Sequence, residues 1–343
     1  MRCADMKRGR KTTVGSTADF RASNILSHHG YRLGKEIGKG SYCKVRIAYG
    51  SCSDGGDSGS SPSPSPSMVS KLACKIIDKR HASEDFVTNF LPREIATIRS
   101  VRHPNIVSIY AIFEIFDKVY IFMDLCKKGD LLDHIREKGP LPEERCKTYF
   151  LQLVSAVEYL HSMEIAHRDL KCENILLKTK YLVKITDFGF SRYCRDPNTA
   201  KRVLSNTFCG SAAYAAPEIL QGISYNPKMY DVWSLGCILF IMLTATMPFD
   251  DSNIANMLKV QLTKQFLFPA SCEHSISTQV KRLIYHLLEP DITKRATIKQ
   301  ICRSRWLNGS AETLAPEKSY SIFQTYCQNI FHDNFHPTKI QSL

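Results

Sequence analysis

The stretch Ile165–Asn174, which reads IAHRDLKCEN, decides the fold of this 343-residue chain. Within it, Arg168 stands directly before the carboxylate of Asp169. Lys171 and Asn174 follow at short spacing. A carboxylate flanked by a lysine and an amide can orient a hydroxyl group and meet a phosphate. An isolated Asp in a loop is often only a cap, so other parts of the chain must support this interpretation.

Three further motifs follow in a fixed order. Asp187–Gly189 (DFG) begins eighteen positions after Asp169, and Ala216–Glu218 (APE) and Asp231–Gly236 (DVWSLG) come later. We expect Glu218 to form a buried ion pair with Arg295.

Two features upstream point to a nucleotide. Gly38–Val45 (GKGSYCKV) has glycines two positions apart between strand-like segments, so its backbone can approach phosphate oxygens closely, although Cys43 replaces the third glycine of G-x-G-x-x-G. Lys75 lies inside an apolar strand, where a buried ammonium needs an acidic partner. Glu94 on the next helix can supply it; a strand-end lysine that extends to solvent is the alternative.

In this order and spacing, the motifs resemble those of the eukaryotic protein kinases over about residues 31–307. The resemblance implies an α+β, two-lobed fold with a small strand-rich N-lobe and a larger helical C-lobe. It also implies ATP as phosphate donor, with Mg²⁺, for which Mn²⁺ could substitute.

The family's roles carry over to matching residues here. Asp169 would accept or orient the substrate hydroxyl proton, and Lys171 would contact the γ-phosphate. Lys75 would pair with the α- and β-phosphates, positioned by Glu94. Asn174 and Asp187 would hold the metal through hard oxygen ligands. The implied nucleotide site consists of Ile37, Gly38, Lys39, Gly40, Ser41, Val45, Ala73, Lys75, Glu94, Met123, Asp124, Cys126, Asp130, Asn174 and Asp187.

Lys171 fits the serine/threonine pattern of the family, as does Ser211, which would bridge Asp169 and Lys171. Glu173 and Asp130 match acidic positions that can face a substrate arginine. We therefore expect protein substrates with Arg three residues before the phosphorylated Ser or Thr.

Regulation is predicted at Thr207, which lies where related kinases carry an activating phosphate. Arg168 could pair with that phosphate and order the loop. The modifying enzyme would be an upstream kinase or the chain itself.

The amino-acid sequences of residues 207–222, 230–236 and 247–254 are similar to those of the testis-specific serine/threonine kinases. This implies a role in spermatogenesis. Three alternatives remain open: another kinase related to the calmodulin-dependent or AMP-activated enzymes, a pseudokinase scaffold and a nucleic-acid-binding module. The pseudokinase predicts the loss of a catalytic residue, whereas all are present. No recognition motif supports nucleic-acid binding.

The composition of the chain indicates in which compartment these functions take place and argues against a membrane protein. The formal net charge is +13, partly from a basic segment at residues 1–30 that we interpret as a flexible tail. Thirteen cysteines without a leader-like start favour reduced thiols inside the cell. The apolar run Leu235–Met247 is too short to span a bilayer. We expect a monomer in the cytoplasm with no membrane contact, and Lys7–Lys11 could give access to the nucleus.

The chain divides into a kinase domain over 31–307 and a C-terminal tail over 308–343. The N-lobe would cover 31–125 and the C-lobe 126–307, with a disordered Ser/Pro insert at 51–70. The expected strands lie within 31–48 and at 71–77, 107–113 and 119–125. The expected helices lie at 85–100, 143–163, 230–243 and 277–288.

Overall fold

A computed structural model describes residues 17–40, 42–51, 69–196, 199, 201–205 and 210–309. They form two compact units. One comprises the described residues up to His81 together with Ala111–Met123. The other comprises Ala82–Tyr110 and the described residues from Asp124 onward.

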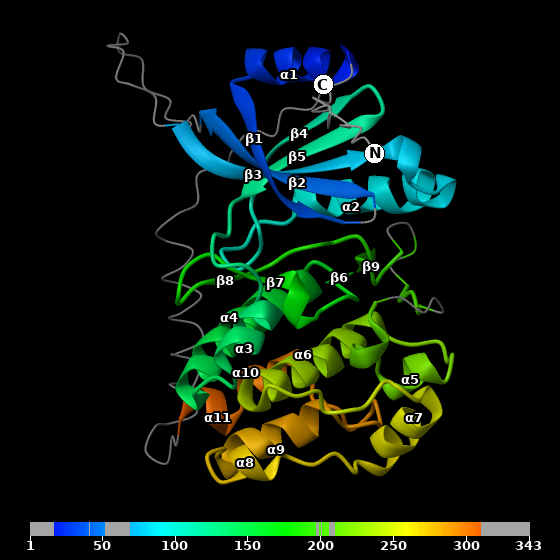
Figure 1. The fold of residues 1–343 in the computed structure, drawn as a ribbon. Helices are drawn as coiled ribbons and strands as arrows, with labels where there is room; N and C mark the ends of the chain where they lie inside the picture. The colour runs from blue at the N-terminus through cyan, green and yellow to red at the C-terminus, as the bar shows by residue number, and fades with distance from the viewer. Residues whose placement is uncertain are drawn as a thin grey trace, which may run out of the picture. The chain divides into compact units, whose positions relative to one another are not determined.

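The first unit is built on a five-stranded sheet with the order β1-β2-β3-β5-β4 (Figure 1). Its strands are β1 (Tyr31–Lys39), β2 (Cys43–Ser51), β3 (Val69–Asp78), β4 (Ile109–Ile115) and β5 (Lys118–Asp124). A 3₁₀ turn, Lys79–His81, follows β3. The chain between β2 and β3 contains most of the predicted Ser/Pro insert, and residues 52–68 lie outside the described part.

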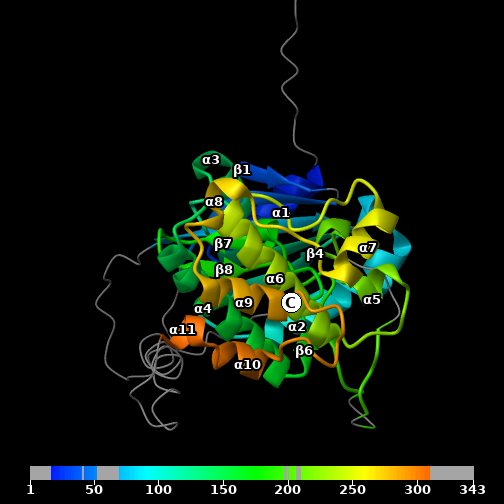
Figure 2. The same ribbon diagram turned by 90° about the horizontal axis from the view of Figure 1, so that it is seen from below.

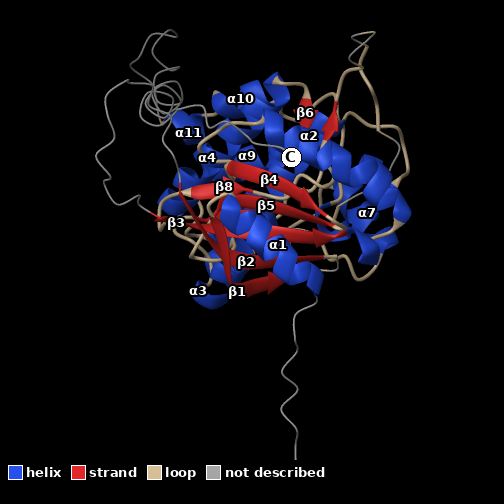
Figure 3. Ribbon diagram, turned by 90° about the horizontal axis from the view of Figure 1, so that it is seen from above, coloured by secondary structure: helices blue, strands red, loops and turns tan. Residues whose placement is uncertain are grey.

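Helix α1 (Thr17–His28) crosses one face of this sheet (Figure 3). Ala22 and Leu26 of α1 are buried, and the carboxylate of Asp19 lies 2.6 Å from Lys118 Nζ at the start of β5. The predicted flexible tail over residues 1–30 is therefore wrong for Thr17–His28. Two buried side chains four positions apart are a weak helical signal, and the sheet beneath supplies the packing that stabilises them.

The second unit has a helical core in which α6 (Pro227–Thr244) contacts both α4 (Glu143–Ser162) and α9 (Thr278–Leu287) (Figure 2). Helix α6 is apolar around most of its circumference and almost entirely buried, as expected for a central helix. A Cβ atom on Gly236 would lie 2.8 Å from Leu288, so glycine is what lets the end of α9 approach α6 closely.

The other elements of this unit position its loops. They are a π-helical turn (Phe86–Phe90), α2 (Leu91–Ser100), α3 (Leu131–Lys138), β6 (Ile165–Ala166), a 3₁₀ turn (Cys172–Asn174), β7 (Ile175–Leu177), β8 (Val183–Ile185), β9 (Arg192–Tyr193), a 3₁₀ turn (Ala212–Tyr214), α5 (Pro217–Leu220), α7 (Ile254–Thr263), α8 (Ala270–Glu273), α10 (Ile298–Cys302) and α11 (Arg305–Asn308). The predicted α+β class, with strands followed by helices, is confirmed.

Most predicted elements differ by one to three residues at their ends, and two of the differences have local reasons. The segment 85–100 is a π-helical turn followed by α2 rather than one helix. The fourth strand begins at Ile109, because the amide of Val107 donates instead to the carbonyl of Ile185, the last residue of β8. Among the described helices, none is both long enough and apolar enough to cross a membrane.

The imidazole of His103 is buried in the second unit. Its Nδ1 accepts from the amide of Asn105 at 3.1 Å, and its Nε2 lies 3.1 Å from Ser155 Oγ. Burial lowers the pKa of His103 to about 3, whereas an unfolded chain has a histidine pKa of about 6.5. The neutral ring thus contributes stability that is complete above pH 6.5 and is lost as the pH falls toward 3.

We therefore expect the free energy of unfolding to decrease below pH 6.5, with His103 contributing up to about 1.4 kcal/mol per pH unit. Urea unfolding of wild type and His103→Gln between pH 7.5 and 4.5 measures this, and the variant should show a shallower slope. The exposed His274→Gln is the matched control and should keep the wild-type slope. Equal slopes for all three proteins would contradict the prediction.

Candidate active site

The carboxylate of Asp169 is the centre of the candidate site. Asp169 is buried, and Lys171 Nζ lies 3.0 Å from its Oδ2 and 3.2 Å from its Oδ1. Asn174 Nδ2 donates to Asp169 Oδ2 at 2.9 Å and to its backbone carbonyl at 2.8 Å. The structure therefore brings together the three polar residues that the sequence places in one short loop, and it holds the carboxylate in a fixed orientation.

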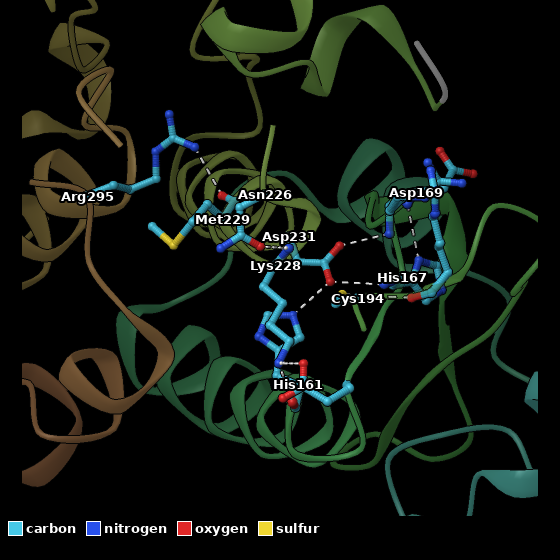
Figure 4. A network of polar contacts seen from close by, with 12 residues as sticks. His161, His167, Asp169, Cys194, Asn226, Lys228, Met229, Asp231 and Arg295 are labelled. Atoms are coloured by element: carbon cyan, nitrogen blue, oxygen red, sulfur yellow. Dashed lines mark hydrogen bonds and ion pairs between the residues drawn. The ribbon is translucent and has the colours of Figure 1, made fainter. Parts of the chain in front are cut away.

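This loop is anchored by the carboxylate of Asp231 on α6, which lies beside it (Figure 4). Asp231 accepts from the backbone amides of His167 at 2.9 Å and Arg168 at 2.8 Å. Its Oδ2 also lies 2.8 Å from His161 Nε2 at the end of α4. These bonds hold Arg168 at a φ of 64°, a left-handed conformation that is costly for a residue with a side chain.

The Asp187–Gly189 turn packs against the same loop. His167 Nε2 lies 3.1 Å from the carbonyl of Thr186, and the His167 and Phe188 rings meet edge to face at 4.9 Å. Asp187 has a φ of 66°. A Cβ on Gly189 would lie 3.5 Å from Asp187 Oδ1 and 3.7 Å from Glu94 Oε2, so both carboxylates face this glycine.

The side-chain oxygens of Asn174 and Asp187 fit a hard divalent cation. Asn174 uses its Nδ2 for both bonds to Asp169, which leaves its amide oxygen for a ligand. Asp187 supplies a carboxylate. Amide and carboxylate oxygens are the donors that Mg²⁺ takes, together with nucleotide phosphates. Asn174 and Asp187 would hold the ion, which would neutralise charge on the phosphates.

Gly210 packs against the loop that holds Asp169, Lys171 and Asn174, which we call the catalytic loop. It has a φ of 87°, and a Cβ there would lie 3.0 Å from the Arg168 carbonyl and 3.2 Å from Asp169 Oδ1. The next residue, Ser211, forms no hydrogen bond with Asp169 or Lys171 in the described part of the chain. The Ser211 bridge therefore stays a prediction.

In the first unit, β1, β2 and β3 carry the predicted nucleotide-binding residues. Val45 pairs with Lys75 across β2 and β3, and Ala73 lies two residues from Lys75 on the same face. Gly38 pairs with Val45, and Ile37 and Lys39 are exposed beside it.

The glycine turn closes through Cys43. The amide of Gly40 donates to the Cys43 carbonyl at 2.8 Å. A Cβ on Gly40 would meet Cys43 Sγ at 3.0 Å. The thiol thus lies beside the second glycine and would have to shift slightly to admit a larger residue at position 40.

Three of the predicted nucleotide-site residues, Met123, Asp124 and Cys126, lie at or just after the end of β5. Met123 is half-buried there and Cys126 follows the strand. Burial raises the pKa of Cys126 to about 11, so its thiol stays neutral. Asp124 has a second function that the sequence does not reveal: its carboxylate lies 2.8 Å from the buried Lys184 and 2.7 Å from Lys178.

This ion cluster fixes the ionisation of Asp124. Burial alone would raise the pKa of the Asp124 carboxyl, but Lys184 and Lys178 outweigh it and hold the pKa well below its ordinary value. The carboxylate also accepts from the amide of Ser108 at 2.9 Å and from Tyr110 at 3.2 Å. Asp124 is therefore a structural anchor for the chain that follows β5.

The two predicted substrate-facing acids lie in the second unit. Glu173 is exposed and accepts a hydrogen bond of 3.4 Å from Tyr214. Asp130 is half-buried and caps α3 by accepting from the amide of Asp133 at 2.9 Å. Both keep carboxylate oxygens that could meet a cation. Ser41 and Thr207 lie outside the described residues.

His161 is a further anchor of the catalytic loop that the sequence does not reveal. No spacing or motif singles out this residue, because its partner Asp231 is seventy positions away. Asp231 itself stands in the DVWSLG motif, and this motif is the one feature of the sequence that points to the anchor.

The chain is similar to a known protein family and to several of its members. The model of the protein kinase domain matches residues 63–307. Testis-specific serine/threonine-protein kinase 1 of Mus musculus is 45% identical over 292 residues, which cover 85% of this chain and 75% of that protein. Testis-specific serine/threonine-protein kinase 3 of the same species is 44% identical, over 83% of this chain and 98% of that protein.

A more distant relative is a plant protein kinase. CBL-interacting protein kinase 9 of Oryza sativa subsp. japonica is 36% identical, over 80% of this chain and 56% of that protein. The family model and these relatives agree with the geometry around Asp169. The chain belongs to the protein kinase family and is an ATP- and divalent-metal-dependent serine/threonine kinase of the testis-specific type.

Proposed function

We propose that this kinase uses ATP with Mg²⁺ to phosphorylate proteins of developing male germ cells and acts in sperm formation. The observation that carries the chemistry is the Asp169 carboxylate, oriented by Lys171 and Asn174, beside the oxygen donors Asn174 and Asp187. The printed names of the testis-specific relatives support the tissue. Mn²⁺ can replace Mg²⁺ in this proposal, because both accept oxygen ligands.

Activity is raised by phosphorylation of Thr207, either by an upstream kinase or by the chain itself. Arg168 supports this proposal, because its guanidinium forms no ion pair with a carboxylate in the described part of the chain. A phosphate supplies nearly two negative charges and ordering hydrogen bonds to such a group.

Thr207→Ala should therefore lower activity toward a peptide substrate by roughly 5- to 150-fold, the range of a typical regulatory coupling. Initial rates of wild type and variant, both incubated beforehand with MgATP, measure this. Thr199→Ala, in the same segment, is the control and should retain wild-type activity. Full activity of Thr207→Ala would refute activation by phosphorylation of Thr207.

The preferred substrates carry Arg three residues before the modified Ser or Thr, supported by the acidic Glu173 and Asp130. A positional peptide library on the purified full-length chain tests this proposal, and an absence of Arg preference would remove it.

We further place the kinase in the cytoplasm as a monomer, with access to the nucleus supported by the basic run Lys7–Lys11. Cell fractionation and light scattering test these two points.

A further inference from the structure

A cavity of about 790 Å³ lies in the first unit, beside the helix that crosses its sheet. Asp19 and Ser23 of α1 form one part of its wall, and residues of β1, β2, β3 and β5 form the rest (Figure 3). Sites for small molecules have volumes of roughly 300–1,000 Å³. The cavity is therefore large enough to hold a small molecule between the helix and the sheet.

The cavity lies on the face of the sheet opposite the predicted nucleotide residues. Lys44 and Arg46 of β2 line it, and because side chains alternate along a strand, Val45 between them points to the other face. Across β2 and β3, Val45 pairs with Lys75, whereas Lys44 pairs with Ile76, which also lines the cavity. The cavity is thus separate from the side of the sheet that carries Val45 and Lys75.

Arg46 brings an uncompensated positive charge to this cavity. Its Nε donates to the carbonyl of Gly34 at 2.7 Å, which fixes the plane of the guanidinium. Within the residues that the structure describes, Arg46 forms no ion pair and no other hydrogen bond. Both terminal nitrogens of the guanidinium can therefore donate to a ligand.

The carboxylates that line the cavity are each paired with a neighbouring cation. The pairs are Asp19 with Lys118 at 2.6 Å, Glu36 with Lys44 at 3.8 Å and Asp78 with Arg80 at 2.9 Å. These acids do not supply a counter-charge for Arg46. The cavity therefore favours an anionic ligand over a cationic one.

Tyr120 of β5 supplies a second group for such a ligand. It lines the cavity and is 3% exposed, yet its hydroxyl has no hydrogen-bond partner in the described part of the chain. Burial raises the pKa of Tyr120 to about 12, while the nearby charge of Arg46 acts to lower it, so the hydroxyl keeps its proton beside the guanidinium. A buried hydroxyl without a partner costs free energy, which an anion accepting from Tyr120 would recover.

We propose that this cavity is a binding site for a small molecule with an anionic head group and an apolar body. The head group, a carboxylate or a phosphate, accepts from the Arg46 guanidinium and from the Tyr120 hydroxyl. The apolar body packs against Leu33 and Ile76, which are half-buried in the cavity wall. The proposal adds a ligand site to the kinase and does not depend on phosphate transfer.

The first test measures binding of 8-anilinonaphthalene-1-sulfonate, an aromatic anion whose fluorescence rises on binding, to the full-length kinase in saturating MgADP. The nucleotide occupies its own site, so binding elsewhere is measured. Arg46→Met should weaken binding about tenfold, because it deletes a charge-assisted bond. Tyr120→Phe should weaken it about threefold, because it deletes a bond from a neutral donor. Arg32→Met is the matched control and should keep the wild-type affinity, since Arg32 is exposed on β1 and lies outside the cavity.

An uncharged probe separates recognition of the charge from binding to any apolar surface. N-phenyl-1-naphthylamine has the same aromatic body without the sulfonate, and Arg46→Met should leave its affinity unchanged. An equal loss of affinity for both probes would overturn the inference, as would equal binding of the sulfonate to wild type, Arg46→Met and Tyr120→Phe. Should Arg46→Met fail to fold, Tyr120→Phe, which removes a single oxygen atom, decides the question.

The second test identifies the head group. 1-Naphthoate and 1-naphthyl phosphate are each added to the wild-type complex with the sulfonate probe, and the decrease in fluorescence is measured. Stronger displacement by one compound assigns the site to carboxylates or to phosphates, and displacement by both assigns it to anions of either kind. Displacement by neither compound would overturn the inference.

Discussion

Replacing Asp169 by Asn should lower the rate of phosphate transfer by a factor on the order of 10²–10⁴, the usual contribution of a positioned acid–base group. An amide oxygen can still accept one hydrogen bond from Lys171 or Asn174, so the loop should keep its shape. It cannot take up the substrate's proton, and it removes the negative charge that orients the hydroxyl. The loss should appear in kcat rather than in ATP affinity.

Steady-state transfer from labelled ATP to a peptide measures kcat, and a fluorescent ATP analogue measures nucleotide affinity. The control is Asp133→Asn on α3, whose carboxylate is 66% exposed and lies outside the catalytic loop. It should behave as wild type. Unchanged kcat in Asp169→Asn would exclude Asp169 as the group that handles the proton and would reopen the assignment of the whole site.

The largest effect on stability should come from removing the buried guanidinium of Arg295. As the sequence predicts, it pairs with Glu218, and the two parallel bonds are 2.7 and 2.8 Å long. The guanidinium also donates to the Glu289 carbonyl at 2.8 Å and stacks over Trp233 at 5.0 Å. The Arg295 side chain has no exposed surface.

Arg295→Met should therefore destabilise the protein by about 3–5 kcal/mol, because it leaves the Glu218 carboxylate buried without a partner. Denaturant unfolding measures the change. The double variant Glu218→Leu/Arg295→Met should recover part of the loss, since it removes both charges. The exposed Arg282→Met is a control and should change stability by less than about 0.5 kcal/mol. A loss below 1 kcal/mol for Arg295→Met would contradict the prediction.

The sequence by itself determined the kinase fold and the catalytic loop. Asp169, Lys171 and Asn174 lie within six positions of one another, so a single tight loop suffices to bring them together. The Arg295–Glu218 pair was also predictable, although it spans 77 positions, because both residues belong to a recognisable family pattern.

Other features were decided only by the tertiary structure. Helix α1 has a weak amphipathic pattern, and the sheet it covers provides its stability. The roles of His161 and of the cluster of Asp124, Lys178 and Lys184 depend on contacts between distant segments, which leave no local pattern.

The Ser205 pocket, in which Arg168 and Arg192 both donate to the Ser205 hydroxyl, has the same origin. In the sequence, Arg168 stands out only by its place before Asp169 and its predicted pairing with a phosphate on Thr207, and no motif singles out Arg192. Only the pairing of β6 with β9 brings them to one hydroxyl. The catalytic loop can be read from the sequence because its residues are close along the chain. Its anchors and the Ser205 pocket require the folded chain, because burial and charge balance are set by residues that meet only there.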